Sequence, residues 1–462
     1  MLASLLLVAC AASVEPPPPP NVVVMMADDL GWGDVGYHES LGGSPEAFTP
    51  HLDAMAQAGV RLERFYSASP VCSPTRASVM TGRHPHRIGV TNANAGHLPD
   101  EEEALGERLR DAGYATGFFG KWHLGTLTAE RRDANRGRPG NTEHLAPPWE
   151  HGFAETFATE SKVPTYDPLW KPPTGPYKTW WEPIDDPAFA LPYGTAYWTG
   201  PNQDVKELRG DDSDLIVDRA EAFIEREAHA GRPFFAVIWF HAPHLPVVAG
   251  EEDAARFAHL SDYEKHYRGS VAALDDAVGR VRATLRDAGV AENTLVTFCS
   301  DNGPEGNTKA PGSAGPLRGR KRDLYEGGVR VPGLIEWPAG GLPNGEATTF
   351  PAVTTDLFPT VLAAVGLEPP TDAGRDGVNL LPALRAGETL RDRPIGFVYQ
   401  SREAWTGDRY KLVRTGRDRP WELYDLQTDP AEADDLAAEQ PDRTREMAAA
   451  FTAWRATLPP AK

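Results

Sequence analysis

The sequence predicts an α/β fold in which a large, mostly parallel sheet is sandwiched by helices, followed by a smaller C-terminal α+β domain that contains an antiparallel sheet. Three observations lead to this fold class. Four continuous apolar runs are spaced along residues 21–299, helical patterns separate them, and shorter strand-like segments follow from about residue 345. Runs that are apolar on both faces are typical of strands inside parallel sheets, and strands that alternate with helices form βαβ units.

The apolar runs are the predicted strands of the large sheet. The first, Asn21–Ala27, lies between a proline tract and a pair of aspartates. The other three cover residues 114–119, 234–240 and 294–299. Each run is followed by residues that can ligate a metal, carry a proton or stabilise charge.

Helix start and stop signals occur between these runs. Thr49 caps a helix that begins at Pro50 and is closed by Gly59. Similar patterns predict helices at residues 101–111, 214–230 after a Ser213 cap, 263–287 and 355–365. Further on, residues 396–399, 410–413 and 422–426 are strand-like, and an acidic, alanine-rich helix completes the chain.

We therefore divide the chain into a tether at residues 1–20, a main α/β domain at 21–345 and a smaller domain at 346–462. Within the main domain, residues 153–210 form an irregular excursion rich in Pro, Trp and Tyr. It is either a surface segment that packs on itself or the wall of a binding site whose aromatic faces stack on sugar rings.

The N-terminus predicts export. A short apolar run ends at Cys10, too short to span a membrane and typical of a signal peptide. Residues 7–10, Leu-Val-Ala-Cys, resemble a bacterial lipobox, which implies cleavage before Cys10 and a lipid anchor on its thiol. Residues 1–4 lack the usual Lys or Arg, so a plain export signal or a degenerate N-terminus is the alternative. The expected location is the periplasm or the outer membrane, as an anchored lipoprotein.

The composition excludes one class of partner. With 46 basic and 66 acidic residues the formal charge is −20, which argues against nucleic acid. An anionic substrate would need a local basic patch, and residues 83–87 and 318–322 are the candidates. Three cysteines do not form a disulfide framework, and Cys299 lies in an apolar run, as expected of a core residue.

Cys72 lies in unusual surroundings for a buried thiol, in the sequence Cys-Ser-Pro-Thr-Arg. Pro74 suits the first turn of a helix and Gly82 suits its end, so Cys72 is predicted at a helix N-terminus. Backbone N–H groups and the helix dipole favour an anion there, and Arg76 lies on the same face. A low-pKa or metal-binding cysteine is the simpler interpretation.

Parallel sheets gather the carboxyl ends of their strands along one edge. The residues that follow the four runs should therefore converge; they are Asp28, Asp29, Lys121, His123, His244, Asp301 and Asn302. Carboxylate and amide oxygens suit a hard cation such as Ca²⁺ or Mg²⁺, although Asp-Asp and Asp-Asn-Gly are individually also good turns.

Four blocks of this sequence resemble the formylglycine-dependent type I sulfatases, an arylsulfatase family in the alkaline phosphatase superfamily. The first block is Cys72-Ser-Pro-Thr-Arg with a Thr-Gly-Arg at residues 81–83. The others are Gly-Lys-Trp-His-Leu-Gly at 120–125, His-Ala-Pro-His-Leu-Pro at 241–246, and Leu-Arg-Gly-Arg-Lys at 317–321 with its continuation at 326–332. Asp28, Asp29, Asp301 and Asn302 match the family's metal ligands, with residue 72 supplying another oxygen.

The resemblance implies a chemistry. A formylglycine-generating enzyme converts Cys72 to an aldehyde, and its hydrate attacks sulfur with help from Asp301. One Ca²⁺ or Mg²⁺ ion, with Arg76, Lys121 and Lys321, stabilises charge on the sulfate oxygens. His244 or Lys321 protonates the leaving alcohol, and His123 takes the proton that releases sulfate. His241 supports His244.

The implied activity is hydrolysis of a sulfate ester, with a sulfated saccharide or small molecule as the substrate. Two alternatives remain open. The same aldehyde could serve a phosphonate monoester or phosphodiester hydrolase, because tetrahedral oxyanions of sulfur and phosphorus make similar demands. A surface glycan-binding lipoprotein with an unconverted Cys72 is the non-enzymatic alternative.

Overall fold

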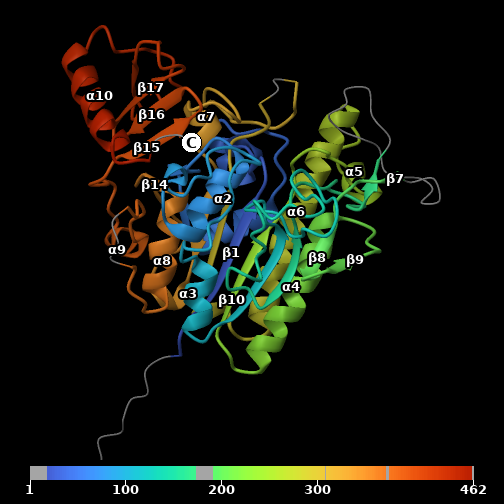
Figure 1. Ribbon diagram of the computed structural model, residues 1–462. Coiled ribbons are helices and arrows are strands. Elements are labelled where there is room, and N and C mark those ends of the chain that lie inside the picture. The colour runs from blue at the N-terminus through green and yellow to red at the C-terminus, as the bar shows by residue number, and fades with distance from the viewer. Residues whose placement is uncertain (1–17, 173–190, 307–308, 371–373, 460–462) are drawn as a thin grey trace, which may run out of the picture.

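The computed structural model describes residues 18–172, 191–306, 309–370 and 374–459. The predicted lipobox, including Cys10, and the centre of the aromatic excursion lie outside these residues. The main feature is a sheet of ten strands in the order β13-β2-β12-β11-β1-β10-β4-β5-β8-β9 (Figure 1). Its strands are β1 (Asn21–Ala27), β2 (Val60–Leu62), β4 (Ala115–Lys121), β5 (Glu155–Thr159), β8 (Tyr197–Gly200), β9 (Gln203–Val205), β10 (Phe234–Trp239), β11 (Thr294–Ser300), β12 (Gly333–Glu336) and β13 (Glu346–Thr348).

The central strands β11, β1, β10, β4 and β5 are all parallel. All four predicted apolar runs lie among them, next to one another, so the predicted α/β fold is confirmed. The outer strands add antiparallel pairs, at β11 with β12 and at β5 with β8. Short pairs lie outside this sheet: β3 (Phe65–Tyr66) with β14 (Ala352–Val353), and β6 (Trp170–Lys171) with β7 (Leu191–Pro192).

Helices cover both faces of the sheet. Along β1, Val23 and Met25 face a core that also contains α1 (Pro50–Ala58), α4 (Asp212–His229) and α6 (Asp262–Asp287). Val22, Val24 and Met26 face the opposite core. That core contains α2 (Cys72–Thr81), α3 (Leu105–Asp111), α8 (Leu357–Ala364) and α9 (Leu380–Ala386). Cys299 is buried in this second core, as predicted. The short helices α5 (Glu251–Ala255) and α7 (Glu326–Val329) complete the main domain.

Two helix starts differ from the prediction for local reasons. α4 begins at Asp212 because Asp211 is its cap, accepting a hydrogen bond from the backbone N–H of Ser213 at 2.8 Å. α3 begins only at Leu105, where Glu107 reaches back to the backbone N–H of Ala104. None of the helices in the described ranges is long and apolar enough to cross a membrane.

The smaller C-terminal unit is a four-stranded antiparallel sheet covered by one helix. Its elements are β15 (Ile395–Tyr399), β16 (Arg402–Thr406), β17 (Tyr410–Arg414), β18 (Glu422–Asp425) and α10 (Pro441–Arg455). The boundary at residue 345 does not match the sheets. β13 pairs with β2 of the large sheet, and α8 and α9 pack in its core. The second sheet therefore begins at Ile395.

A buried ion cluster, here called the Lys411 cluster, joins the two sheets. Lys411 Nζ on β17 lies 2.9 Å from Glu326 Oε1 on α7 and 3.0 Å from Glu432 Oε1. All three side chains are fully buried. Tyr66 donates to Glu326 Oε2, and the backbone N–H of Glu326 donates to Glu432 Oε2. The two units are therefore held by charge as well as by apolar contact.

Candidate active site

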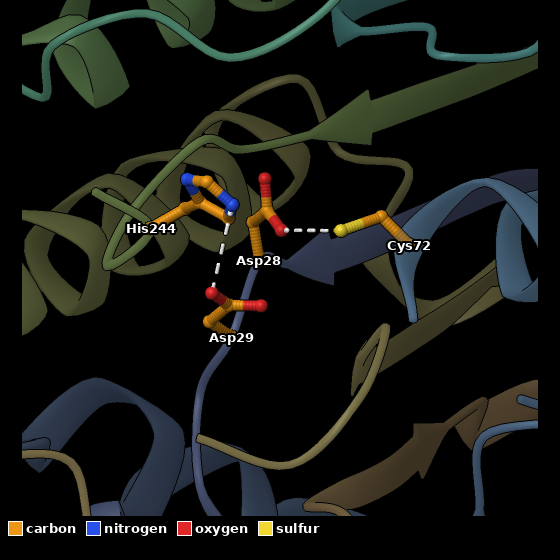
Figure 2. Close-up of side chains that lie close together, drawn as sticks. All are labelled: Asp28, Asp29, Cys72 and His244. Atoms are coloured by element: carbon orange, nitrogen blue, oxygen red, sulfur yellow. Dashed lines mark hydrogen bonds and ion pairs between the residues drawn. The ribbon is translucent and has the colours of Figure 1, made fainter. Parts of the chain in front are cut away.

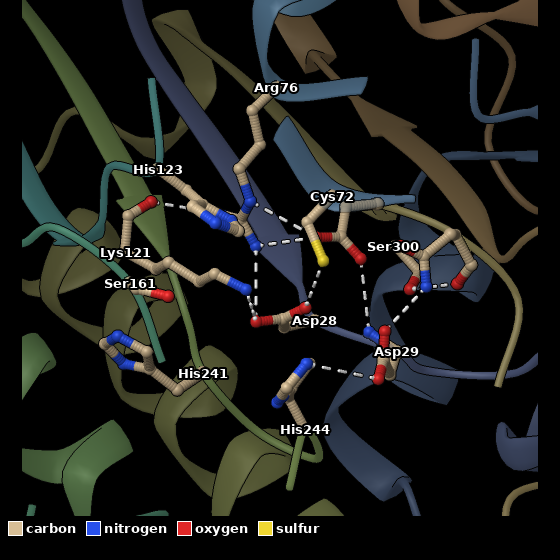
Figure 3. Close-up of polar contacts among 12 residues, drawn as sticks. Asp28, Asp29, Cys72, Arg76, Lys121, His123, Ser161, His241, His244 and Ser300 are labelled. Carbon is tan, nitrogen blue, oxygen red and sulfur yellow. Dashed lines mark hydrogen bonds and ion pairs between the residues drawn. The ribbon is translucent and has the colours of Figure 1, made fainter. Parts of the chain in front are cut away.

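The carboxyl ends of four adjacent strands bring the predicted residues together (Figure 3). Backbone hydrogen bonds align the strand ends, from Asp28 N–H to the carbonyl of Ala242 and from Asp301 N–H to the carbonyl of Ala27, both 3.1 Å. Sequence spacing alone cannot show this convergence, because Asp28 and Asp301 are far apart in the chain. The order of strands in the sheet creates it.

Cys72 begins α2, as predicted, and the helix ends at Gly82 in the left-handed conformation. Its Sγ lies 3.5 Å from Asp28 Oδ1 and 3.6 Å from Lys321 Nζ. Burial, and after it the charge of Asp301, raises the pKa of the Cys72 thiol to about 12. The low-pKa interpretation of Cys72 is therefore wrong: tertiary burial outweighs the helix dipole.

Arg76 lies one turn along α2 and is fully buried. Its Nε and Nη2 donate to Asp301 Oδ2 at 3.2 and 2.8 Å, and Nη1 donates to the carbonyl of Lys121 at 2.9 Å. The guanidinium thus holds Asp301 and the end of β4 in place. Its charge is therefore paired with the carboxylate of Asp301, beside residue 72.

Two lysines complete the centre. Lys121 Nζ lies 2.5 Å from Asp28 Oδ2, and Lys321 Nζ lies 2.5 Å from Asp29 Oδ1. Both lysines and both aspartates are buried. Buried charges of this kind are stable only when they are paired.

The acidic side chains form a cluster that fits a cation. Ligand atoms of Asp28, Asp29, Cys72 and His244 lie within 4.8 Å of one another (Figure 2). Asp29 Oδ2 and Asn302 Oδ1 are buried and have no hydrogen-bond partner among the described residues. Oxygen atoms left open in this way are the donors that a hard divalent ion prefers. Of the predicted ligands, Asp28, Asp29 and Cys72 lie in this cluster, and Asn302 adds an open oxygen; His244 joins them. Asp301 is outside the cluster, and its carboxylate accepts hydrogen bonds from Arg76 and from the backbone N–H of Asp29.

The carboxylates differ in their protonation. Burial would raise the pKa of Asp28, but Lys121, His244 and Arg76 together hold it well below its usual range. Burial raises the pKa of Asp29, and burial together with Asp28 raises that of Asp301 to about 7.

Two histidines present a free ring nitrogen to the centre. Burial, followed by the charge of Lys121, lowers the pKa of His123 well below its usual value, so the ring is neutral. Its Nε2 lies 2.7 Å from Asn94 Oδ1, which can only accept, so Nε2 carries the proton. Nδ1 is then a base, buried and without a partner among the described residues. His123 has a φ of 57°, so a left-handed turn of the backbone sets the direction of its side chain.

In His244 the proton is on the other ring nitrogen. Its Nδ1 lies 2.6 Å from the carbonyl of Leu245 and so carries a proton, while Nε2 lies 3.6 Å from Asp29 Oδ2. Burial lowers the pKa of His244 well below its usual value. His241 does not face the centre: it is bonded to Asp212 and Thr159, at 2.8 Å each, and supports the loop that carries His244.

Of the two predicted basic patches, one residue reaches the centre. Arg83 and Arg87 lie beyond the far end of α2 and pair with Glu102 and Asp376. In the 318–322 segment only Lys321 enters the centre. Arg318 lies over the ring of Tyr325, and Arg322 pairs with Glu305 at 2.7 Å. Arg83, Arg87 and Arg322 are thus paired with acidic residues from other parts of the sequence.

Five residues near the centre were not predicted. Asn94 orients His123, and Asn135 Nδ2 bonds both Asn94 and Ser161 at 3.1 and 2.7 Å. Lys162 is half-buried, and burial followed by the charges of Lys121 and Lys321 lowers its pKa. Ser161 and Lys162 follow β5, so the rule for strand ends would have found them had β5 been recognised. Tyr399, at the end of β15, lies within range of the charge of Lys321, so the C-terminal sheet reaches the rim.

Comparison with known proteins gives a consistent result. The profile of the Sulfatase family matches residues 20–367, and that described as "N-sulphoglucosamine sulphohydrolase, C-terminal" matches residues 319–452. N-acetylgalactosamine-6-sulfatase of Sus scrofa is 37% identical over 415 residues, which are 86% of this chain and 72% of the relative. Steryl-sulfatase of Rattus norvegicus is 32% identical over 78% of this chain and 69% of its own length.

Solved structures are also similar. Ps i-CgsB, solved in complex with k-i-k-neocarrahexaose, superposes with a TM-score of 0.79 at 29% identity over 94% of this chain and 92% of that one. A phosphonate monoester hydrolase from Silicibacter pomeroyi gives a TM-score of 0.65 at 21% identity, over 95% of this chain and 96% of that one. At that identity the likeness concerns the fold alone.

Proposed function

Because this chain belongs to the sulfatase family and is a sulfuric ester hydrolase, we propose that it removes sulfate from a saccharide with an aldehyde made from Cys72 and a bound divalent cation. The observation that carries the proposal is the position of Cys72. It is buried at the start of α2, between Asp28 at the end of β1 and Lys321 in the loop that precedes α7. A thiol with no reactive thiolate needs conversion before it can serve as a nucleophile.

When formed, the aldehyde hydrate supplies the attacking oxygen and a second hydroxyl group, and a bound cation polarises the sulfate oxygens. Asp28, Asp29, Asp301 and Asn302 would hold that cation, and the open oxygens of Asp29 and Asn302 support this assignment. Conversion of Cys72 requires a formylglycine-generating enzyme that acts before export.

The side chains of this chain have separate tasks. Lys121 and Lys321 bring two ammonium groups to the site of the sulfate, where negative charge grows during S–O cleavage. Lys321 or His244 gives a proton to the leaving alcohol. Lys321 Nζ already carries its protons beside residue 72, whereas His244 Nε2 must first gain one, because the ring is neutral with its proton on Nδ1. His123 Nδ1 is placed to accept the proton whose loss releases sulfate, since its other nitrogen is occupied by Asn94.

The saccharide is inferred from relatives. N-acetylgalactosamine-6-sulfatases are 37% identical, and Ps i-CgsB was solved with an oligosaccharide. The decisive experiment is a panel of defined sulfated mono- and oligosaccharides, tested with protein whose residue 72 is verified as an aldehyde by peptide mass analysis. Preference for a sulfated sugar over aryl sulfate supports the proposal. Full activity with an intact thiol contradicts the nucleophile.

The same protein decides between the alternatives. A kcat/KM higher for an aryl phosphonate monoester than for an aryl sulfate would make it a phosphonate hydrolase. Tight saccharide binding without hydrolysis by fully converted protein would make it a glycan-binding lipoprotein. Lipid anchoring through Cys10 and an exported location belong to the proposal as well, and mass analysis of the N-terminal peptide tests them.

A further inference from the structure

A cavity of about 650 Å³ lies between the main domain and the C-terminal sheet, at the end of α2 opposite to Cys72. Its walls include residues just after α2, the start of β15 and the tryptophans Trp405 and Trp454. The lining residues Val353, Ile395 and Trp454 come from β14, β15 and α10, and Figure 1 shows where these elements lie. None of the described residues that line the cavity belongs to the candidate active site.

The wall of the cavity is positively charged. Four arginines line it against a single carboxylate, that of Asp376. Arg87 pairs with Asp376, and Arg391 pairs with Asp356. Arg393 is exposed and has no carboxylate partner among the residues that the structure describes; it donates to the carbonyl of Arg375 at 3.5 Å. A positive wall is notable in a chain of net charge −20 and favours an anionic ligand.

His84 adds an open hydrogen-bond donor. The side chain lines the cavity and is only 4% exposed. Its Nδ1 accepts a hydrogen bond from the backbone N–H of His86, and burial, with the nearby His86 and Arg87, lowers its pKa well below the usual value. The ring is therefore neutral with its proton on Nε2. That N–H has no partner among the described residues, so a ligand oxygen is the missing acceptor.

Aromatic rings form another part of the wall. Trp454 stands edge-on to His84 with ring centres 5.1 Å apart, and Trp405 lies 5.4 Å from Trp454. Gly396 permits this arrangement, because a Cβ there would come within 2.4 Å of the Trp454 ring. Indole rings beside guanidinium groups and an N–H donor suit a sugar ring that carries an anionic group.

We propose that this cavity is a second binding site, which takes one anionic saccharide unit, a sugar ring bearing a carboxylate or a sulfate, independently of the catalytic centre. The volume is in the range of sites that bind small ligands. The inference rests on the lining of the cavity and goes beyond the proposed hydrolysis.

Binding is tested in the full chain without turnover. The background is Cys72→Ala combined with Lys321→Ala, which disables the catalytic centre. The probe is a disaccharide of glucuronic acid and 6-O-sulfated N-acetylgalactosamine, measured by isothermal titration calorimetry. We expect one equivalent to bind, and Arg393→Gln or His84→Phe to weaken it by about tenfold or more. Arg417→Gln, an exposed charge change outside the cavity, is the matched control and should leave binding unchanged.

The proposal is overturned if the background protein does not bind the probe, or if Arg393→Gln and His84→Phe both bind it as the background does. Arg393 is exposed, so its variant should fold even if the His84 variant does not. Inorganic sulfate that binds as tightly as the disaccharide would overturn the saccharide part. With Cys72 and Lys321 intact, Arg393→Gln should hydrolyse an aryl sulfate normally, so failure of this site and failure of the proposed reaction are distinguishable.

Discussion

The Lys411 cluster and the candidate active site both contain buried charges, and they differ in whether their polar atoms have partners. In the Lys411 cluster, two glutamates share one ammonium, and their remaining oxygens accept hydrogen bonds from Tyr66 and the backbone. In the candidate active site, three carboxylates face Arg76, Lys121 and Lys321, yet Asp29 Oδ2, Asn302 Oδ1 and His123 Nδ1 lack hydrogen-bond partners among the described residues. Glu432 Oε1 also lacks a hydrogen bond, but it lies 3.0 Å from the Lys411 ammonium, so the charges of the Lys411 cluster neutralise one another. The unpartnered atoms of the candidate active site are instead available to ligands and chemistry.

The largest expected effect is the loss of activity when the nucleophile is removed and the fold is kept. Cys72→Ala should lower kcat by about 10⁴-fold or more while costing no more than about 1–2 kcal/mol of stability. Hydrolysis of an aryl sulfate and thermal unfolding measure the two quantities. Near-normal turnover by this variant would refute the nucleophile.

Removal of the bound cation should have the second largest effect on activity. Chelation is expected to reduce activity by at least about 100-fold, because Lewis-acid stabilisation is worth several kcal/mol. Added Ca²⁺ or Mg²⁺ should restore activity and raise the melting temperature, since only the folded protein binds the ion. Full activity in protein shown by elemental analysis to be free of metal would contradict the cation site.

Lys411→Met should lower stability and leave activity unchanged, which is the opposite of the result expected for Cys72→Ala. It leaves two buried glutamates without their cation and should cost about 3–5 kcal/mol of stability. The kcat of the folded fraction should stay unchanged, since the cluster touches no reacting atom. Lys206→Met is the control, because Lys206 pairs with Asp204 at an exposed site and should cost less than about 1 kcal/mol. Equal losses in both variants would remove the distinction between the clusters.

Lys321→Ala tests the same comparison in the candidate active site. It removes an ammonium that contacts both Asp29 and residue 72, so kcat/KM should fall by about 10²–10³-fold. Its stability cost should be smaller than that of Lys411→Met when the cation is present, because the cation still neutralises Asp29. Chemical unfolding of the two variants in excess Ca²⁺ gives the comparison. A greater loss for Lys321→Ala would show that the catalytic cluster is also the main structural one.

The smallest effect concerns pH. Burial, and after it the neighbouring Glu326, raises the pKa of Glu432 from 4.5 to about 7. The stability that Glu432 contributes is thus fully present below pH 4.5 and is lost as pH rises through about 7, by about 1–3 kcal/mol. Glu432→Gln should flatten the unfolding free energy between pH 5 and 8. An unchanged pH profile in this variant would show that Glu432 ionises normally.

Much of the fold and of the site could be predicted from the sequence. Contiguous stretches of sequence encode four of the five central strands, the position of Cys72 at the start of its helix, and the strand-end residues from Asp28 to Asn302. These features depend on apolar runs, on Pro and Gly signals and on short motifs, all of which act within a few residues. They can therefore be predicted without knowing which strands are neighbours in the sheet.

Only the tertiary structure decided the rest. It assigned Arg83 and Arg87 to distant acids, moved the start of the second sheet to Ile395, and turned His123 towards Asn94. It also raised the pKa of Cys72, because desolvation depends on everything packed around the thiol. Partner choice and burial are properties of the packed chain, and residues remote in sequence determine both.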